Sequence, residues 1–338
     1  MHTRPLPASC LLASLICLAP GVACTSTTDG SKPDKPKLAS NPTDAAPALA
    51  EAGSDAVAVC SGCPSDVRPA SDMVLRVHHV HLNVKDAPTT IAFYEKFFAA
   101  RKVRLNGKAD ALWADPLLLL LQEGDFDFSD TLQYGFEHIG MGVKDPTAWF
   151  EMAAMEGIMA DPRNGAPESP VSFPITPGSV PFFDPGVDTF SYIYVRGPNS
   201  ERVETWSGLA RFRHTHFMTP DIDTTVAWYQ QLLGVKPMLA MADPGSVLST
   251  NGFSLDDVQL NFLSPATPED YVKADDQPVG HIAFSVPDLD AMFEHAKSIG
   301  ATIVSEPADT PLGFRSFFVR APQEVLLEFV AAGKVVVP

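Results

Sequence analysis

The chain has 338 residues, 45% of them hydrophobic, so it can bury a substantial core and is expected to hold two domains. Its formal net charge is −17 at pH 7. Such an acidic surface repels phosphate backbones, which argues against nucleic acid as a partner.

The first residues have the organisation of a signal peptide. Arg4 lies in a short polar start, and the apolar run CLLASLICLAP (10–20) follows it. This run is too short to cross a bilayer as a helix, which argues against a transmembrane segment. GVAC (21–24) then offers a cleavage site of small residues, so residues 1–23 are predicted to be a signal peptide of an exported protein.

GVAC also resembles a bacterial lipobox, in which Cys24 would be the lipidated residue. This resemblance predicts a membrane-anchored lipoprotein of a bacterial envelope. Gly21 stands where Leu is usual, so the alternative of a simply secreted or periplasmic protein stays open.

Residues 24–70 are rich in Ser, Thr, Pro, Ala and charge, which predicts a disordered tether. Cys60 and Cys63 form a C-x-x-C pair near its end. A redox pair needs a βα context and a zinc knuckle needs a second cysteine pair, and the sequence offers neither. In an exported protein, a local structural disulfide is the favoured interpretation.

From Arg76 onward the chain repeats one unit four times. Each unit has a His in an alternating apolar run and an Asp seven residues after that His. The four frames are HVHLNVKD (79–86), HIGMGVKD (138–145), HTHFMTPD (214–221) and HIAFSVPD (281–288). The period of two predicts a strand, and the Asp is a good N-cap for a helix that follows.

Helices are predicted over 86–99, 145–157, 221–234 and 288–300, and three of these segments end in Gly. Apolar residues recur at helical spacing, as Ile91, Tyr94 and Phe98 do in the first of them. Short β-rich runs follow each helix, among them LLLLLQ (117–122), FSYIYV (190–195) and VQLNFL (258–263). Each unit is therefore predicted to be βαβββ in an α+β fold, and four units make two pairs.

Residues 161–188 interrupt the second unit with seven prolines and no clear period. A loop of this length is usually a lid, a binding loop or an insertion. Phe173, Phe182 and Phe183 make a lid over a cavity one hypothesis, and a rigid surface excursion is the equal alternative.

This organisation resembles the vicinal oxygen chelate superfamily, which includes glyoxalase I, methylmalonyl-CoA epimerase, extradiol dioxygenases and bleomycin-binding proteins. The resemblance rests on the four strand–helix openings, on FYEKFFA and WYQQLLG in the helices, and on the closing strands. It implies two tandem incomplete β-barrels, each around a divalent metal. The expected domains are residues 71–208 and 209–338.

The resemblance also implies the metal ligands. It places one on the first strand of each unit, which maps to the His of each frame, and another on the last strand, six residues after a Pro. GPNSERVE (197–204) and APQEVLLE (321–328) keep this spacing. The expected sets are His79, His138 and Glu204 in the first domain, and His214, His281 and Glu328 in the second. Two imidazoles and one carboxylate favour Fe²⁺, with Zn²⁺, Ni²⁺ or Mn²⁺ as other possibilities.

The family's fourth ligand position falls within LLLLLQ in the first unit and near Asn261 in the third. Glyoxalase I and the epimerase tend to carry Glu or Gln there, so the resemblance to these two weakens. His81 and His216 are expected to be pocket groups that orient substrate or move protons. Tyr194 stands in the Tyr position of extradiol dioxygenases, where the second domain has Phe318, but the dioxygenase His before it is absent.

The sequence therefore predicts an exported, divalent-metal-dependent enzyme of this superfamily that acts on a small oxygenated molecule, by dioxygenase-like or lyase/isomerase-like chemistry. The alternative is a protein of the bleomycin-resistance type that binds or sequesters a small molecule without chemistry, since fold does not fix function. The oligomeric state stays open.

Overall fold

The structure, a computed structural model, describes Val74 and residues 76–128, 135–163, 166–174, 189–235, 238–241, 250–255, 258–264 and 277–332. The predicted signal peptide, tether, lipidated Cys24 and Cys60–Cys63 pair lie outside these residues. Within them, no helix has both the length and the apolar character that crossing a bilayer requires.

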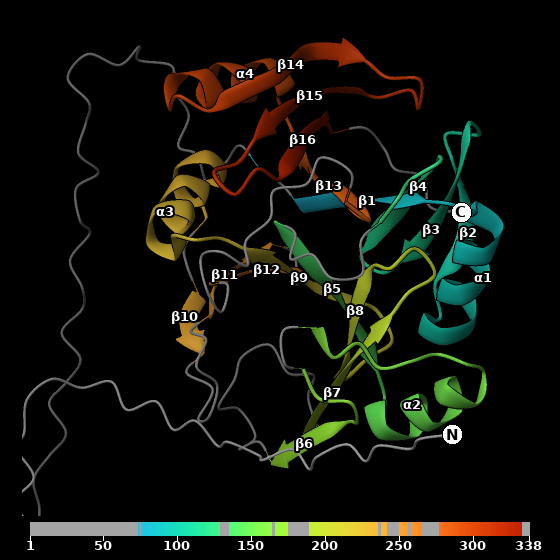
Figure 1. Cartoon of the computed structure of the whole chain (residues 1–338). Coiled ribbons are helices and arrows are strands. Elements are labelled where there is room, and N and C mark those ends of the chain that lie inside the picture. The colour runs from blue at the N-terminus through green and yellow to red at the C-terminus, as the bar shows by residue number, and fades with distance from the viewer. Residues whose placement is uncertain are drawn as a thin grey trace, which may run out of the picture. The chain divides into compact units, whose positions relative to one another are not determined.

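The described chain forms sixteen strands and four helices in four βαβββ units, as predicted (Figure 1). Unit 1 contains β1 (Arg76–Val84), α1 (Ala87–Phe98), β2 (Arg101–Leu105), β3 (Ala109–Ala114) and β4 (Leu117–Glu123). Unit 2 contains β5 (Phe136–Val143), α2 (Pro146–Met155), β6 (Val171–Pro174), β7 (Thr189–Arg196) and β8 (Arg202–Ser207). Unit 3 contains β9 (Phe212–Met218), α3 (Ile222–Leu233), β10 (Met238–Met241), β11 (Thr250–Leu255) and β12 (Val258–Leu263). Unit 4 contains β13 (Val279–Val286), α4 (Leu289–Ser298), β14 (Thr302–Asp309), β15 (Arg315–Arg320) and β16 (Leu326–Ala331).

An aspartate begins each helix, as its place in the repeat predicts. The Asp86 carboxylate accepts a hydrogen bond of 2.7 Å from the Thr89 backbone N–H, and Asp145, Asp221 and Asp288 cap their helices in the same way. Gly234 ends α3 with φ 66°, a left-handed conformation that costs Gly little. Local sequence therefore determines where each strand ends and the following helix begins.

The strands form two eight-stranded sheets that combine units from opposite halves of the chain. One sheet has the order β14-β15-β16-β13-β1-β4-β3-β2, so it joins unit 4 to unit 1. The other has the order β10-β11-β12-β9-β5-β8-β7-β6, so it joins unit 3 to unit 2. The antiparallel pairs β1–β13 and β5–β9 lie at the centres of the sheets. Two pairs of units were predicted and are found, but the pairs are units 1 and 4 and units 2 and 3, rather than the expected units 1 and 2 and units 3 and 4.

Helices, in contrast, contact each other within each half. The Trp149 indole N–H of α2 donates to the Phe97 carbonyl of α1 at 2.7 Å, and the Trp149 ring lies 5.1 Å from that of Phe98. In the second half, His295 Nε2 of α4 lies 2.9 Å from the Gln231 carbonyl of α3. Helices thus connect unit 1 to unit 2 and unit 3 to unit 4, while each sheet contains one unit from each half of the chain.

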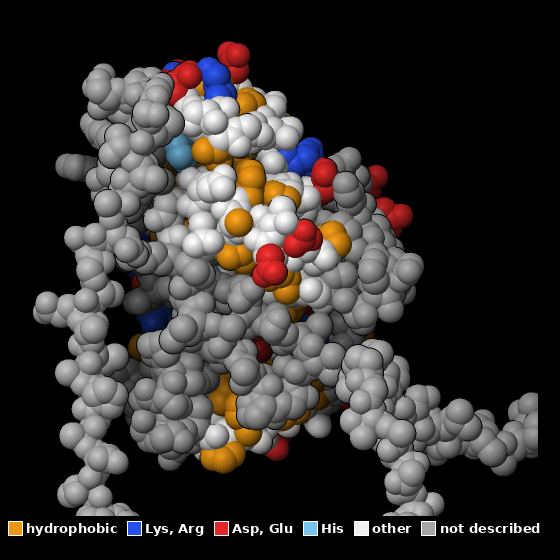
Figure 2. All heavy atoms as spheres, turned by 90° about the vertical axis from the view of Figure 1, so that its left-hand side faces the viewer, with side chains coloured by type: hydrophobic (Ala, Val, Ile, Leu, Met, Phe, Trp, Pro, Cys, Tyr) orange, Lys and Arg blue, Asp and Glu red, His pale blue; other side chains and the backbone are white. Residues whose placement is uncertain are grey.

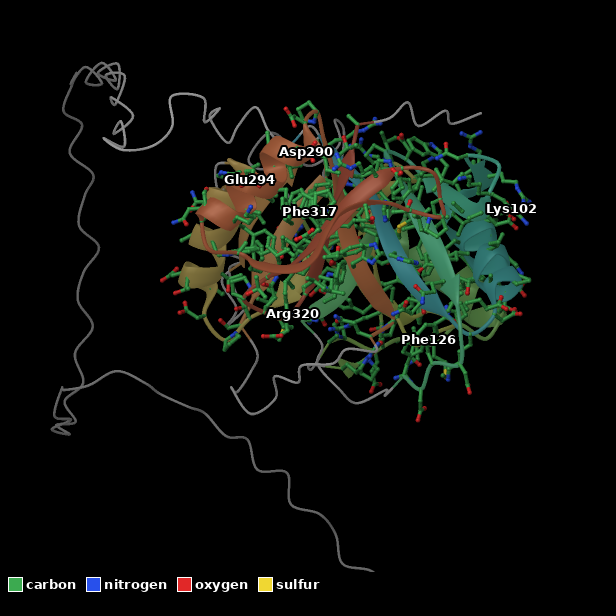
Figure 3. All side chains as sticks on the ribbon, turned by 90° about the horizontal axis from the view of Figure 1, so that it is seen from above. Lys102, Phe126, Asp290, Glu294, Phe317 and Arg320 are labelled. Atoms are coloured by element: carbon green, nitrogen blue, oxygen red, sulfur yellow. The ribbon has the colours of Figure 1, made fainter. Side chains whose placement is uncertain are left out.

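A single hydrophobic cluster runs through both sheets and includes residues of all four units. Its fully buried members include Val80, Tyr94, Met141, Phe217 and Phe284. Figure 3 shows the contrast on unit 4, where Phe317 lies inside while Asp290 and Glu294 of α4 lie at the periphery. Figure 2 shows charged side chains at the top of the face turned to the viewer and further acidic ones over its middle and right side. Burial of this common core holds the central strands, and therefore their histidines, in place.

The segment 161–188 is described only in part. Val171–Pro174 forms the edge strand β6, which pairs with β7 and places the Phe173 ring 4.9 Å from that of Phe190. Phe173 is therefore part of a sheet edge, which removes it from the proposed lid. Phe182 and Phe183 lie outside the described residues.

Candidate metal centres

The central strand pairs bring histidines from opposite halves of the chain together. Where β5 meets β9, His138 is the partner of His216 and Gly140 is the partner of His214. Side chains two residues apart on a strand point to the same face, so the three imidazoles gather on one side of the sheet. Glu204 reaches them from β8, which pairs with β5. The group formed by His138, Glu204 and His214 is called centre II below.

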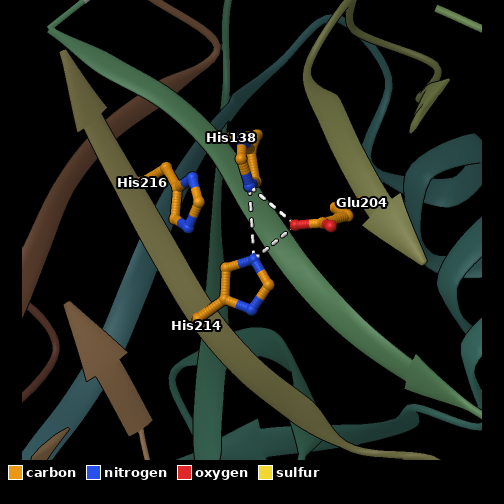
Figure 4. A group of neighbouring side chains, drawn as sticks. All are labelled: His138, Glu204, His214 and His216. Carbon is orange, nitrogen blue, oxygen red and sulfur yellow. Dashed lines mark hydrogen bonds and ion pairs between the residues drawn. The ribbon is translucent and has the colours of Figure 1, made fainter. Parts of the chain in front are cut away.

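Centre II is a compact triangle of ligand atoms (Figure 4). His138 Nε2 lies 3.2 Å from His214 Nε2. Glu204 Oε2 lies 3.1 Å from the first of these nitrogens and 2.8 Å from the second. His216 completes a group of four whose ligand atoms all lie within 4.8 Å of one another.

Centre I is the equivalent triangle at the junction of β1 and β13. His79 Nε2 lies 3.3 Å from His281 Nε2, and Glu328 Oε2 lies 3.0 Å and 3.2 Å from these two nitrogens. All three side chains are buried. His81, which pairs with His281 across the strands, places its Nδ1 3.2 Å from His281 Nδ1.

Both triangles fit a divalent metal ion. Bonds of about 2.0–2.2 Å at angles between octahedral and tetrahedral values set ligand atoms about 2.8–3.6 Å apart. In each triangle two imidazole nitrogens face each other beside one carboxylate oxygen, and hydrogen bonds among these three atoms cannot satisfy all of their lone pairs. A bound cation stabilises this arrangement because all three atoms can donate lone pairs to it. Gly140 adds a steric argument, because a Cβ at this position would overlap the His214 ring. The backbone of β5 thus makes room for that imidazole.

The protonation states also suit ligands. Burial opposes the charge of Glu204, but His214 and His138 outweigh it and lower the pKa of the carboxyl to about 2. Burial lowers the pKa of His214 and of His281 below the ordinary value. Burial also opposes the charge of His138, yet Glu137 and Glu204 raise its pKa above the ordinary value. An ionised carboxylate beside neutral imidazoles is the donor set that binds divalent metal, and the His138 proton must leave when metal binds.

Polar groups surround centre II. The carboxylate of Glu137 bonds to His138 Nδ1 and forms a buried ion pair with Arg202. The Arg202 guanidinium lies 3.9 Å from the centroid of the Tyr194 ring, which in turn lies 5.1 Å from the His138 ring. The His216 ring is 4.1 Å from His138. The predicted catalytic residues Tyr194 and His216 therefore both lie against this centre.

Apolar and imidazole groups surround centre I instead. Phe318, the repeat equivalent of Tyr194, lies 5.1 Å from the His281 ring. Phe314 lies 6.1 Å from the His79 ring and packs on a buried apolar cluster. That cluster consists of Val103, Leu105, Ala111, Leu118 and Leu120. His78 places its Nδ1 2.8 Å from His79 Nδ1. Burial lowers the pKa of both His78 and His81 to about 3.

Strand register identifies the fourth position of each centre. Glu328 lies two residues beyond the partner of His281, and the same step from the partner of His79 on β4 leads to Leu120. On β12 the step from the partner of His214 leads to Asn261. Centre I therefore has a hydrocarbon side chain at this position and centre II has an amide.

The structure regroups the six predicted ligands. The sequence placed His79 with His138 and Glu204, but the structure brings His79 to His281 and Glu328. His138 and Glu204 instead join His214. The physical reason is the sheet order, because each first strand pairs with a first strand from the other half. Metal binding by the six residues stays a prediction.

Sequence reasoning missed Glu137, Arg202 and Gly140. Adjacent residues of a strand point to opposite faces, so nothing marked Glu137 as a neighbour of the His138 ring. A comparison of the repeats gives a signal, because Glu137 and Arg202 are charged where unit 4 has Gly280 and Leu326. Buried charges that replace small or apolar residues indicate a specific role.

Comparisons with known proteins agree with this geometry. Residues 211–329 match the model of the Glyoxalase/Bleomycin resistance protein/Dioxygenase superfamily. The structure resembles that of glyoxalase I from Zea mays with a TM-score of 0.56, over 76% of this chain and 92% of that chain, at 15% identity. A mutant of the same enzyme gives a TM-score of 0.55 over 76% and 93% of the chains at 14% identity. The uncharacterized protein YwbC of Bacillus subtilis (strain 168) is 28% identical over 130 residues, which cover 35% of this chain and 95% of that protein.

At these identities the structural likeness speaks for the fold alone. The structural likeness covers all four units together, and the match to the family model covers units 3 and 4. Residues 211–329 therefore form a domain of the glyoxalase/bleomycin resistance protein/dioxygenase superfamily, and the four units together have the fold of glyoxalase I.

Proposed function

We propose that the protein is a divalent-metal-dependent enzyme that acts on a small oxygenated molecule at centre II, and that Fe²⁺ is the favoured metal. The observation that carries this proposal is the convergence of two imidazoles and one carboxylate beside two groups suited to proton transfer. Three ligands on one side leave coordination positions for two neighbouring oxygens of a substrate. A bound divalent ion supplies a Lewis acid that polarises those oxygens.

His216 and Tyr194 divide the proton chemistry between them. Burial first, and then His138 and His214, lower the pKa of His216 well below its ordinary value, so its imidazole is neutral. Among the described residues its Nδ1 has no hydrogen-bond partner, so in the tautomer with hydrogen on Nε2 this nitrogen can accept a proton from substrate. Burial and the Glu204 charge raise the pKa of Tyr194 well above the ordinary value, so its hydroxyl stays protonated and can donate.

Centre I is less suited to this chemistry. Centre I has Phe318, which has no hydroxyl group, where centre II has Tyr194. It also has Leu120 at the fourth position, where centre II has the Asn261 amide. His81 is the one counterpart that is kept, and it contacts His281. We infer that centre I binds metal or ligand with a smaller part in turnover.

Two reaction classes remain within this proposal. Dioxygenase-like chemistry on a catechol consumes oxygen and needs His216 to replace the histidine that extradiol enzymes carry before the Tyr. Lyase-like or isomerase-like chemistry on a hydroxy-carbonyl compound needs proton transfer without oxygen. Asn261 stands where glyoxalase I and the epimerase tend to carry Glu or Gln, which weighs against the isomerase class.

The test is metal analysis of protein purified without oxygen, followed by turnover of catechols and hydroxy-carbonyl compounds with an oxygen electrode. The proposal expects retained divalent metal and turnover that Glu204→Ala abolishes. Oxygen uptake identifies the dioxygenase class, and turnover without uptake identifies the other. If the protein retains no metal and His79→Ala with His214→Ala leaves ligand binding intact, the protein is instead a binding or sequestering protein.

We further propose export and anchoring of the chain through Cys24. This proposal rests on residues 1–24 of the sequence alone. Mass spectrometry of the mature N-terminus tests it, since a diacylglycerol on the Cys24 sulfur supports the anchor, a cleaved and unlipidated chain supports simple secretion, and an intact residue 1 contradicts export.

A further inference from the structure

The two centres share a ligand set but differ in what holds their imidazoles, and the internal repeat makes the comparison direct. Glu137 of unit 2 occupies the position of Gly280 in unit 4, and Arg202 occupies that of Leu326. Both centres keep the ligands themselves. Apart from Leu120 and Asn261 at the fourth position, the groups behind the ligands are therefore what can make metal binding differ between the two centres.

At centre II those groups form a continuous buried chain of bonds. Glu137 joins His138 Nδ1 through one carboxylate oxygen and the Arg202 guanidinium through the other. Arg202 also donates to the Arg163 carbonyl at 2.8 Å. Arg163 is held in turn by two bonds of 2.8 Å from its Nε to the carboxylate of Asp161. These contacts leave the Glu137 carboxylate little freedom to leave His138.

A carboxylate at Nδ1 prepares an imidazole for a metal ion. It favours the tautomer with hydrogen on Nδ1, which leaves the Nε2 lone pair free to bind the metal. It also makes that nitrogen a better donor. Because the carboxylate is fixed by Arg202, the imidazole plane is fixed as well.

Among the described residues, imidazoles occupy these places at centre I. His281 Nδ1 lies 3.2 Å from His81 Nδ1, and His79 Nδ1 lies 2.8 Å from His78 Nδ1. A neutral imidazole can accept or donate a hydrogen bond, so it fixes neither tautomer of its neighbour and adds no negative charge.

We propose that Glu137, held by Arg202, is a positioning residue that fixes His138 for metal and makes centre II the tighter of the two metal centres. This inference rests on the proposed function only in that both centres bind divalent metal. Loss of such a partner typically weakens metal binding about 10- to 100-fold. The tighter centre then coincides with the one that carries Tyr194 and His216.

The experiment measures Co²⁺ binding, by calorimetry and visible absorption, in metal-free full-length protein. Glu328→Ala removes a ligand of centre I and leaves centre II to be measured alone, and Glu204→Ala does the reverse. The expected result is tighter Co²⁺ binding in Glu328→Ala than in Glu204→Ala. Adding Glu137→Gln should weaken the former about 10- to 100-fold and leave the latter unchanged.

A second variant keeps the test decisive if Glu137→Gln folds poorly, since it leaves the Arg202 charge buried without a carboxylate. Glu137→Ala with Arg202→Leu removes both charges and approaches the composition that unit 4 carries, and the same loss of Co²⁺ affinity is expected at centre II alone. Equal affinities at the two centres, or an equal effect of Glu137→Gln on both, would overturn the inference while leaving the proposed function intact. Absence of Co²⁺ binding at both centres would instead overturn the proposed function.

Discussion

Glu201 is a buried carboxyl group whose ionisation should make the protein less stable as pH rises. Its side chain is 2% exposed and accepts a hydrogen bond of 3.1 Å from the Tyr94 hydroxyl and one of 2.7 Å from the Asn199 backbone N–H. Burial outweighs these neutral donors and raises the pKa of Glu201 from 4.5 to about 7. The repeat has Val325 at this position, which is also fully buried.

The sign follows from the direction of this shift. Because the folded protein holds the Glu201 proton more tightly than the unfolded chain, its contribution to stability is fully present below pH 4.5 and is lost as pH rises to about 7. One pKa unit corresponds to about 1.4 kcal/mol, so the loss is about 3 kcal/mol. Above this range the contribution is constant.

Glu201→Gln should remove this dependence, because the amide has the shape of the protonated acid and carries no charge. Urea unfolding of wild type and variant, with chelator present, should give equal stability near pH 4.5 and a variant about 3 kcal/mol more stable at pH 8. The control is Glu151→Gln on the exposed face of α2, which makes the same replacement away from the buried carboxyl group. A difference between Glu201→Gln and wild type that stays constant across this range would refute the reasoning.

Two further substitutions test the backbone of the centres and of the closing turns. Gly140→Ala should displace the His214 ring and abolish Co²⁺ binding at centre II, while centre I keeps its metal. The control is Ala283→Gly at the equivalent position beside His79, which should leave Co²⁺ binding at both centres intact. Metal retained at centre II in Gly140→Ala would contradict the fit. Glu324→Gly should raise the free energy of unfolding by about 0.5 kcal/mol, since Glu324 has φ 67° and a Cβ costs about 1 kcal/mol there. Glu156→Gly, where φ is −96°, should lower it, and urea unfolding measures both.

The repeat pattern predicted the local structure well because local physics determines it. Asp86 and its equivalents cap helices through hydrogen bonds that span three residues, and the alternation in HVHLNV specifies a strand whatever its partner. The turns before β8 and β16 show the same dependence on local geometry. Ser200 and Glu324 have positive φ values of 62° and 67° there, a conformation that Gly adopts at the least cost.

Strand pairing could not be predicted in this way. Alternation specifies which face of β1 is buried, but any of three other first strands could lie beside it. The choice of β13 over β5 separates His79 from His138, although both were recognised as candidate ligands. The role of Glu137 could not be predicted for a related reason, because its contact with His138 depends on Arg202 from a neighbouring strand. Long-range geometry, rather than residue identity, was the missing information.

The central claim is that each metal centre takes ligands from both halves of the chain. The most direct test is the Co²⁺ content of two double variants, measured by plasma mass spectrometry after removal of free ion. His79→Ala with His281→Ala should remove about one of two metal equivalents, because both residues belong to centre I. His79→Ala with His138→Ala should remove both equivalents, because it disables one ligand in each centre. The opposite result, with one equivalent left in the second variant and none in the first, would contradict the account.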